Sequence, residues 1–237
     1  MPGAFKFAEM LNGTDIIYAV SHNHYAGEFN SKSYIFRGTV YNPETGTGGD
    51  DFTLLTANWP NRYQNLFAFK IGANTRLVAH IENGPLYYSD DEGSTWSQSF
   101  GLAQANTSTT INRQDSHTIY ATDDRKVYVS TNNGESFSVL KDFGSKKSSF
   151  LYTPRFSVQS NSENVYLARG GTFYQLNNDK TDFIQLGSYK SNHNSNKFSI
   201  GGDSRVLYVT ENSNYWVSTD GGNTWVSKSP NGNWYGD

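Results

Sequence analysis

This chain has no cysteine and no marked excess of either charge. Without cysteine no disulfide can stabilise the fold, but 237 residues are enough to bury a core without one. Lys and Arg together number 19, and Asp and Glu together number 22. This balance argues against nucleic acid or an anionic membrane as the partner, because phosphate binding needs a basic excess.

Long apolar runs are also missing. No stretch approaches the ~18 apolar residues of a membrane span. The first seven residues lack the charged and apolar regions of a signal peptide. We therefore expect no membrane insertion, and we prefer a cytoplasmic location to secretion without a visible signal. The chain instead has 16 Tyr, 15 Phe and 22 Gly, a composition that predicts an all-β fold of short strands and tight turns.

An eight-residue pattern repeats along the chain. Three segments align without gaps: Ser89–Trp96, Ser130–Phe137 and Ser218–Trp225. The first two start 41 residues apart, and the second and third start 88 apart, which is twice 44. Degraded copies stand at Tyr174–Phe183, in which Asn178 aligns with Asn132, and at 40–46, where the turn starts at Asn42. A period of this length is typical of repeat architectures.

The pattern has the chemistry of a hairpin turn. An Asp at its third position, as in Asp91 and Asp220, can fold its carboxylate back onto backbone N–H groups of its own loop. The glycine at the fifth position permits positive φ, and the closing aromatic can pack against the sheet. The glycines are Gly93, Gly134 and Gly222, and the closing aromatics are Trp96, Phe137 and Trp225.

These octets resemble the Asp-box, or BNR, repeat of sialidases, xyloglucan-type glucanases and other β-propellers. The resemblance implies a sialidase-like propeller, closest in size to small five-bladed propeller lectins. It also implies that the boxes are structural corners that lie away from the binding face.

Strands around each box repeat as well, four to a box, so we predict one β-propeller domain over residues 1–237 with about five four-stranded blades. The fourth blade is expected to open on a strand at Phe156–Val158. The strand count begins on a first strand and ends on a fourth, so ring closure would depend on packing between blades; alternatively, the chain is part of a larger ring or assembly. The blades are expected at 5–58, 65–100, 107–142, 155–187 and 197–228.

The resemblance implies a binding face made of the loops opposite the boxes. On this sequence those loops are rich in Asn, Arg and aromatics, which can bind sugar hydroxyls or stack on sugar rings, although turn residues in general look the same. The strongest candidate is Trp59 in a loop over residues 58–63, either as a stacking platform or as a plug between blades. The predicted ligand-binding residues are Trp59, Asn61, Arg62, Tyr63, Asn83, Arg125, Arg155, Arg169, His193 and Asn214.

The expected function is lectin-like binding of carbohydrate without catalysis. No segment matches the sialidase Phe/Tyr-Arg-Ile-Pro pattern, since 153–156 has the wrong order. No catalytic residue, cofactor or metal site is predicted, because His22 and His24 lack a third ligand. Glycans are the expected partners, and an oligomer is compatible with the sequence. The alternatives are a glycoside hydrolase of sialidase or xyloglucanase type and a protein-binding scaffold.

Overall fold

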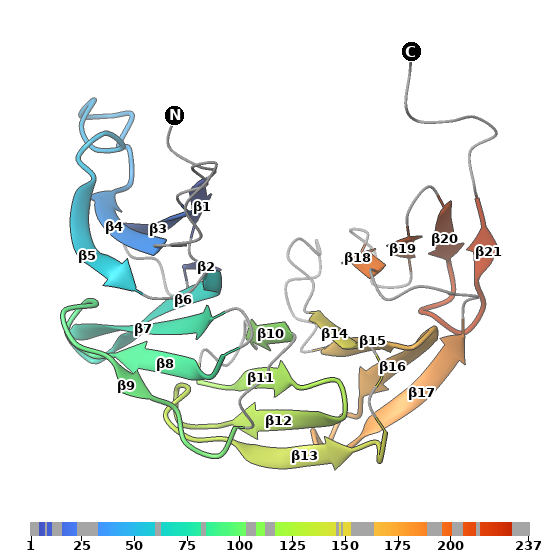
Figure 1. Cartoon of the computed structure of the whole chain (residues 1–237). Coiled ribbons are helices and arrows are strands. Elements are labelled where there is room, and N and C mark those ends of the chain that lie inside the picture. The colour runs from blue at the N-terminus through green and yellow to red at the C-terminus, as the bar shows by residue number, and fades with distance from the viewer. Residues whose placement is uncertain are drawn as a thin grey trace, which may run out of the picture. The chain divides into compact units, whose positions relative to one another are not determined.

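The structure is a computed structural model, and its secondary structure consists of β-strands (Figure 1). The all-β prediction is confirmed. Among the described residues, no helix is long and apolar enough to cross a membrane. The structure describes residues 5–7, 9–10, 16–22, 33–59, 63–81, 84–102, 108–111, 117–145, 147, 149–152, 164–188, 196–200, 206–211 and 214–228.

The described strands form five sheets, numbered here 1 to 5 along the chain. Sheet 1 has the order β1 (Phe5–Phe7), β3 (Ile16–His22), β4 (Ser33–Thr39), β5 (Thr53–Trp59). Sheet 2 is β2 (Glu9–Met10), β6 (Tyr63–Ile71), β7 (Asn74–Ile81), β8 (Leu86–Ser89), β9 (Ser97–Gln98). Sheet 3 is β10 (Ser108–Ile111), β11 (Ile119–Thr122), β12 (Lys126–Ser130), β13 (Ser138–Asp142). Sheet 4 is β14 (Ser149–Tyr152), β15 (Tyr166–Arg169), β16 (Thr172–Leu176), β17 (Phe183–Ser188), and sheet 5 is β18 (Asn196–Ile200), β19 (Leu207–Glu211), β20 (Asn214–Ser218), β21 (Val226–Ser227).

Two strands differ from the sequence prediction. The first strand of sheet 4 is β14, whereas the strand expected at Phe156–Val158 lies outside the described residues. The short strand β2 was not predicted, and it pairs in parallel with β6 at the edge of sheet 2. Strands β14 and β2 are short, with four and two residues, and no turn residues in the sequence mark where either strand begins or ends.

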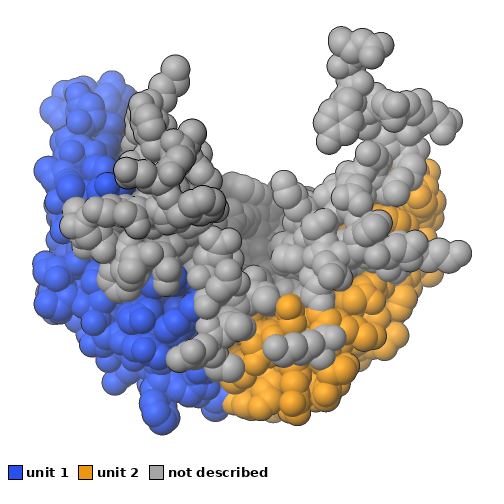
Figure 2. Space-filling view, in the orientation of Figure 1, with its two compact units in different colours: residues 1–106, 116–119, 130–138 blue, residues 107–115, 120–129, 139–237 orange. Residues whose placement is uncertain are grey.

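The chain divides into two compact units (Figure 2). Sheets 1 and 2 belong to the first unit, and sheets 4 and 5 belong to the second. The boundary runs through sheet 3, because residues 130–138 belong to the first unit and residues 120–129 to the second.

The turn over residues 89–96 is locked by side-chain hydrogen bonds. The Ser89 hydroxyl accepts a bond from Gly93 N at 2.8 Å and donates one to Asp91 Oδ1 at 2.7 Å. The Asp91 carboxylate also accepts from Thr95 N at 2.8 Å and from Thr95 Oγ1 at 2.6 Å. These bonds hold the pKa of Asp91 at about 2, with the Thr95 hydroxyl as the largest cause. The predicted fold-back of the carboxylate onto its own loop is therefore confirmed.

The turns over 130–137 and 218–225 repeat this pattern, and we call the three of them box turns. Asp220 accepts from Ser218, from Thr224 N at 2.9 Å and from Thr224 Oγ1 at 2.7 Å, and its pKa is also about 2. In the middle turn Asn132 takes the place of the acid. Its Oδ1 accepts from Ser136 N at 3.0 Å, and its Nδ2 donates to Ser136 Oγ at 2.9 Å. An amide therefore completes the same lock without charge.

The glycine and the tryptophan of a box turn act together. Gly93 and Gly222 have φ values of 92° and 96°, which confirms the prediction that these positions need positive φ. This backbone aims the glycine carbonyl at the closing indole. Trp96 Nε1 donates to Gly93 O at 3.0 Å, and Trp225 Nε1 donates to Gly222 O at 2.9 Å.

The degraded copy in sheet 4 uses a different residue from the one that the alignment predicts. The residue aligned with Asn132 is Asn178, but the acceptor is Asn177, whose Oδ1 accepts from Thr181 N at 2.8 Å. Lys180 is at positive φ in this turn. In sheet 1 the turn starts at Asn42, as expected. The carboxylate that binds the start of this turn comes from Asp51, which lies outside the turn. Asp51 accepts from Thr39 N at 2.8 Å and from Thr39 Oγ1 at 2.7 Å.

Consecutive sheets pack face to face within each unit. In the first unit, Tyr18 of sheet 1 packs with Leu77 of sheet 2, and both are fully buried. In the second unit, Tyr166 of sheet 4 packs with Leu207 of sheet 5. We call the face of a sheet that meets the following sheet its trailing face, and the face that meets the preceding sheet its leading face.

Each box turn also meets the sheet before it. Ser99 Oγ, just after β9, donates to Gly134 O in the box turn of sheet 3. Phe100 N donates to Glu135 O at 3.0 Å, and Phe137 N donates to Phe100 O at 2.9 Å. In the second unit, the backbone of Gly187 in β17 lies so close to Gly222 O that a Cβ there would be 2.3 Å from it. A box turn is therefore half of a contact between sheets as well as a hairpin.

We predict that Gly222→Ala destabilises the protein more than Gly93→Ala. Both changes force a side chain to positive φ, which costs about 1–3 kcal/mol. At Gly222 the new Cβ would also lie 2.5 Å from Phe173 Cδ1, whereas at Gly93 the nearest heavy atom is 3.5 Å away. Overpacking should add about 1–3 kcal/mol at Gly222 alone. Urea denaturation of the two variants measures the difference, and equal losses would show that φ alone decides.

A second prediction concerns acid stability. Because the pKa of Asp91 and of Asp220 is about 2 in the folded protein against an ordinary 3.8, both carboxylates stabilise the fold above pH 4, and this stabilisation is lost as the pH falls to about 2. The double variant Asp91→Asn, Asp220→Asn should fold, because Asn132 already makes an amide lock. Its free energy of unfolding, measured in urea at pH 6, 4 and 3, should fall less with acid than that of the wild type. An unchanged acid profile would assign the loss to other carboxylates.

Candidate ligand-binding site

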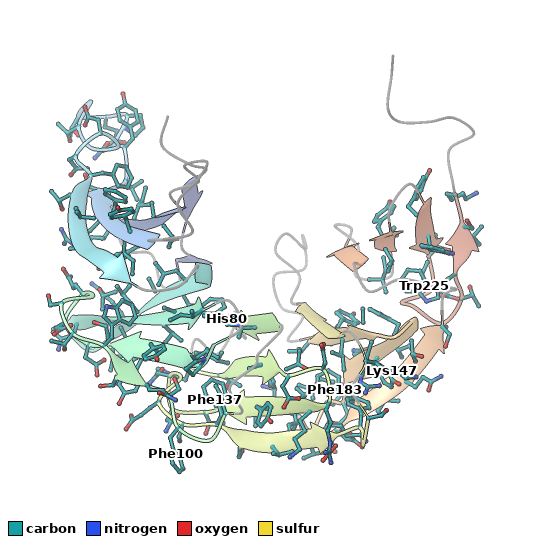
Figure 3. The ribbon with its side chains drawn as sticks, in the orientation of Figure 1. His80, Phe100, Phe137, Lys147, Phe183 and Trp225 are labelled. Carbon is teal, nitrogen blue, oxygen red and sulfur yellow. The ribbon has the colours of Figure 1, made fainter. Side chains whose placement is uncertain are left out.

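Three connections of the second unit meet beside one another. They are the turn between β11 and β12 at 123–125, residues 142–145 and 147 at the end of β13 and after it, and the turn between β15 and β16 at 169–171. The carbonyl of Asp124 joins them, since it accepts from Lys147 N at 2.9 Å and from Arg169 Nη2 at 3.3 Å. We call these three segments the connection cluster; Figure 3 labels Lys147.

The first turn of the cluster is held by Asp123. Its Oδ1 accepts from Arg125 N at 3.0 Å and from Lys126 N at 2.6 Å, and its Oδ2 accepts from Tyr128 Oη at 2.8 Å. Asp124 then takes a φ of 70°, which is uncommon outside glycine. The Asp123 carboxylate is thus occupied by its own turn, and Arg125 is presented at the surface.

Arg125 makes a two-bond pair with Asp142. Its Nε and Nη2 each lie 3.0 Å from one carboxylate oxygen, and the Arg125 side chain is 47% exposed. Arg125 and then the Gly144 amide lower the pKa of Asp142 below its ordinary value. Lys126 Nζ approaches the same carboxylate at 3.9 Å. The pair fixes a fork of donors and acceptors in an exposed position.

Arg169, in the third segment of the cluster, is only 5% exposed. Its Nη2 donates to the carbonyls of Asp124 and Ser145, and its guanidinium carbon lies 4.5 Å from the centroid of the Phe143 ring. Burial lowers the pKa of Arg169. The guanidinium therefore braces the connections from its buried position, which favours support of the site over direct contact with a ligand.

The predicted ligand-binding residues thus fall into three groups. Arg125 and Arg169 come together in the cluster. The loop predicted at 58–63 is shorter than expected, because Trp59 is the last residue of β5, opposite Ser33, and Tyr63 is the first of β6. Asn214 is the first residue of β20, opposite Glu211. The other predicted residues, Asn61, Arg62, Asn83, Arg155 and His193, lie outside the described residues.

Sequence reasoning missed Asp142, Phe143 and Ser145. These residues follow an outer strand, and nothing in their order marks them as binding groups. One signal could have pointed to Asp142. It is the last residue of β13, and Arg125 directly precedes β12, the antiparallel strand beside it. In the part of the chain that the structure describes, no group of three or more His, Cys, Asp or Glu residues is placed to hold a metal ion.

No protein-family model and no curated protein matches this sequence. Solved structures match at low identity. The GH74 enzyme of Niastella koreensis is similar over 96% of this chain with a TM-score of 0.62 and 19% identity. YCF48 from Cyanidioschyzon merolae is similar over 94%, with a TM-score of 0.58 and 13% identity. YCF48 bound to D1 peptide is similar over 94%, with a TM-score of 0.54 and 11% identity.

These similar proteins are β-propellers. This chain has the β-propeller fold. It spans 38% of the GH74 chain and 71% and 66% of the two YCF48 chains. The connection cluster therefore belongs to the loops that join neighbouring sheets of a propeller and that join the second and third strands within a sheet.

We predict that Arg169→Met destabilises the protein by about 1–3 kcal/mol, because the carbonyls of Asp124 and Ser145 lose a charged donor that is itself buried. Arg125→Met should leave stability nearly unchanged, since its ion pair is exposed to solvent. Urea denaturation of both variants makes the comparison. If Arg169→Met left the free energy of unfolding unchanged, Arg169 would have no bracing role and would again be a candidate ligand contact.

Proposed function

We propose that this propeller binds carbohydrate without reacting with it, and that the connection cluster is one of its sugar sites. The observation that carries the proposal is the fixed pair of Arg125 and Asp142 at the surface of the cluster. Sugar hydroxyls are both donors and acceptors, so a site for them needs donors and acceptors held at fixed positions. Arg125 supplies N–H donors and Asp142 supplies lone pairs from one rigid unit.

The surroundings of the pair support a binding role. Lys126 Nζ lies 3.9 Å from the Asp142 carboxylate, and Lys147, which binds the Asp124 carbonyl through its backbone amide, is exposed. The bracing by Arg169 and the Asp123 turn hold the pair in place before a ligand arrives, which reduces the entropy lost on binding.

The carboxyl groups of the described residues are suited to act as hydrogen-bond acceptors and not as general acids. Every one of them with a perturbed pKa is shifted downward, whereas the general acid of a glycosidase needs a raised pKa. In the cluster itself, Asp142 is kept ionised by Arg125. The groups shifted downward are Asp51, Asp91, Asp142, Asp182 and Asp220.

We further propose that the box turns are Asp-boxes of the BNR type and that sheets 1 to 5 are five propeller blades. The shared lock of Ser, Asp or Asn, positive-φ glycine and closing aromatic supports the first point. The second rests on the recurrence of a four-stranded antiparallel sheet, to which sheet 2 adds the short parallel strand β2. In a blade so built, the box turns and the connection cluster lie at opposite ends of the strands.

A second candidate is peptide binding. The outer strands of four sheets each carry an exposed apolar side chain: Leu54 at 51%, Val139 at 50%, Ile184 at 55% and Val226 at 54%. Among the described strands, each of these ends its sheet and leaves one edge where an extended peptide can add as a further strand. One similar propeller is YCF48 bound to D1 peptide. A third candidate is hydrolysis of a glycoside, because the GH74 enzyme of Niastella koreensis has a similar fold.

We predict that Arg125→Met weakens glycan binding about tenfold or more, because hydrogen bonds from a charged donor are lost. A glycan array on the wild type identifies the sugar, and titration then compares the variants. Lys141→Met is the matched control, since Lys141 pairs with Asp182, lies in the same unit and is placed in β13 as Asp142 is.

The outcomes separate the three candidates. Binding on the array that Lys141→Met preserves and Arg125→Met weakens supports the sugar site. Turnover of fluorogenic glycosides by the wild type would replace binding with hydrolysis. An empty array together with capture of an extended peptide would favour the outer strands.

A further inference from the structure

Arg169 is a buried cation that makes no ion pair with a carboxylate of the described residues. Its Nη2 donates only to the carbonyls of Asp124 and Ser145, and its Nε is buried and makes no hydrogen bond. Burial is the largest influence on the pKa of Arg169 and lowers it, whereas the charge of Asp124 raises it least. Carbonyl dipoles and the ring of Phe143 compensate the buried charge only in part. The connection cluster therefore contains a positive charge that still favours an anion nearby.

Two further cations of the same unit share a single carboxylate. Arg125 binds Asp142 through Nε and Nη2, and in the part of the chain that the structure describes its Nη1 makes no hydrogen bond. Lys126 Nζ lies 3.9 Å from the same carboxylate. Together with Lys126, the cluster has four cationic side chains and three carboxylates, although the whole chain has 19 basic and 22 acidic residues.

A fourth cation, Lys147, is positioned by a glycine. A Cβ on Gly170 would lie 2.6 Å from Lys147 Cδ and 3.3 Å from Lys147 Cβ, so the aliphatic part of the lysine packs on the bare backbone of Gly170. The backbone amide of Lys147 is held by Asp124 O. Both the backbone and the aliphatic part of this exposed lysine are therefore fixed in place.

The donors of the cluster favour one kind of anion. A planar carboxylate is bound best by a two-bond arginine fork, but the Nε–Nη2 fork of Arg125 is already occupied by Asp142. Lys126 and Lys147 are point charges from separate segments of the chain. Single donors of this kind match the several oxygens of a tetrahedral anion.

We propose that the connection cluster binds a sugar that carries a sulfate or phosphate ester, and that Arg125, Lys126 and Lys147 hold the ester. This inference rests on the sugar site proposed above and names the class of sugar that it takes. Arg169 needs no direct contact with the ester, because the charge of a buried group is screened less than that of an exposed one. Since the net charge of the chain is −3, attraction of anions depends on this local group and not on the whole surface.

All of these residues belong to the second compact unit. The proposed contacts therefore come from one unit and require no contribution from the first.

The class of sugar is tested on a glycan array that carries each oligosaccharide in neutral, sulfated, phosphorylated and uronic acid forms. We expect the sulfated or the phosphorylated form of the best-bound oligosaccharide to bind about tenfold or more tightly than its neutral form. The tighter of these two forms identifies the ester. Uronic acid forms that bind as tightly as the esters would overturn the preference for a tetrahedral anion.

Two variants locate the ester. Lys147→Gln removes a charge from an exposed side chain, and Gly170→Ala keeps that charge but places a methyl group where the lysine packs. We call the ratio of the Kd of the neutral form to the Kd of the ester form the ester preference. Lys147→Gln should lower the ester preference about tenfold, because a hydrogen bond from a charged donor is lost, and Gly170→Ala should lower it in the same direction.

The control is Lys70→Gln, which removes the same charge from an exposed lysine of the first unit and should leave the ester preference unchanged. An ester preference that Lys147→Gln leaves intact would overturn the inference, as would an equal loss in Lys70→Gln. Neutral forms that bind as tightly as the esters would also overturn it while the sugar site itself stood. An array on which no oligosaccharide binds would overturn both the inference and the sugar site.

Discussion

The serine hydroxyl at the start of each box turn is the interaction on which the rest of the fold depends. It accepts a hydrogen bond from the backbone N–H of the glycine four residues later. It also donates a hydrogen bond to the side-chain oxygen of the Asp or Asn two residues later. This closes a loop whose fifth residue must take positive φ. Only then does the glycine carbonyl face the indole, and only then can the neighbouring sheet approach its backbone. Phe173 stands where a Cβ of Gly222 would be, so the lock and the packing between sheets 4 and 5 are one feature.

The same feature explains what the sequence could predict. The Ser, Asp and Gly of the octet act within eight residues, so their spacing alone determined the turn, the folded-back carboxylate and the positive φ. The strands beside them followed from the repeat. Sheet 4 shows the limit: with no glycine or serine lock, its turn uses Asn177, and the alignment with Asn132 pointed one residue further along the chain. The first strand of that sheet was likewise missed, because a four-residue strand in a long connection has no periodic signal of its own.

The candidate site was less predictable than the fold, for a physical reason. Arg125 could be named from its turn, but the residues that make it useful come from other parts of the chain. Asp142 pairs with it from the end of the next strand but one, and Arg169 supports it from the following sheet. Contacts between segments 17 and 45 residues apart depend on the pairing of whole strands, and a single sequence does not encode them locally. The loop predicted at 58–63 likewise begins later than expected, because strand β5 extends to Trp59.

The contact of each box turn with the preceding sheet has a consequence for how the protein comes apart. Arg76 of β7 binds Asp90 of its own sheet and reaches Asn132 O and Glu135 in the next box turn. Each such box turn is therefore coupled both to its own sheet and to the sheet before it, as neighbouring units are in an array of repeats. A box turn that opens should then loosen the preceding sheet as well as its own, so the amide hydrogens of β7 and of the turn at 130–137 should exchange together.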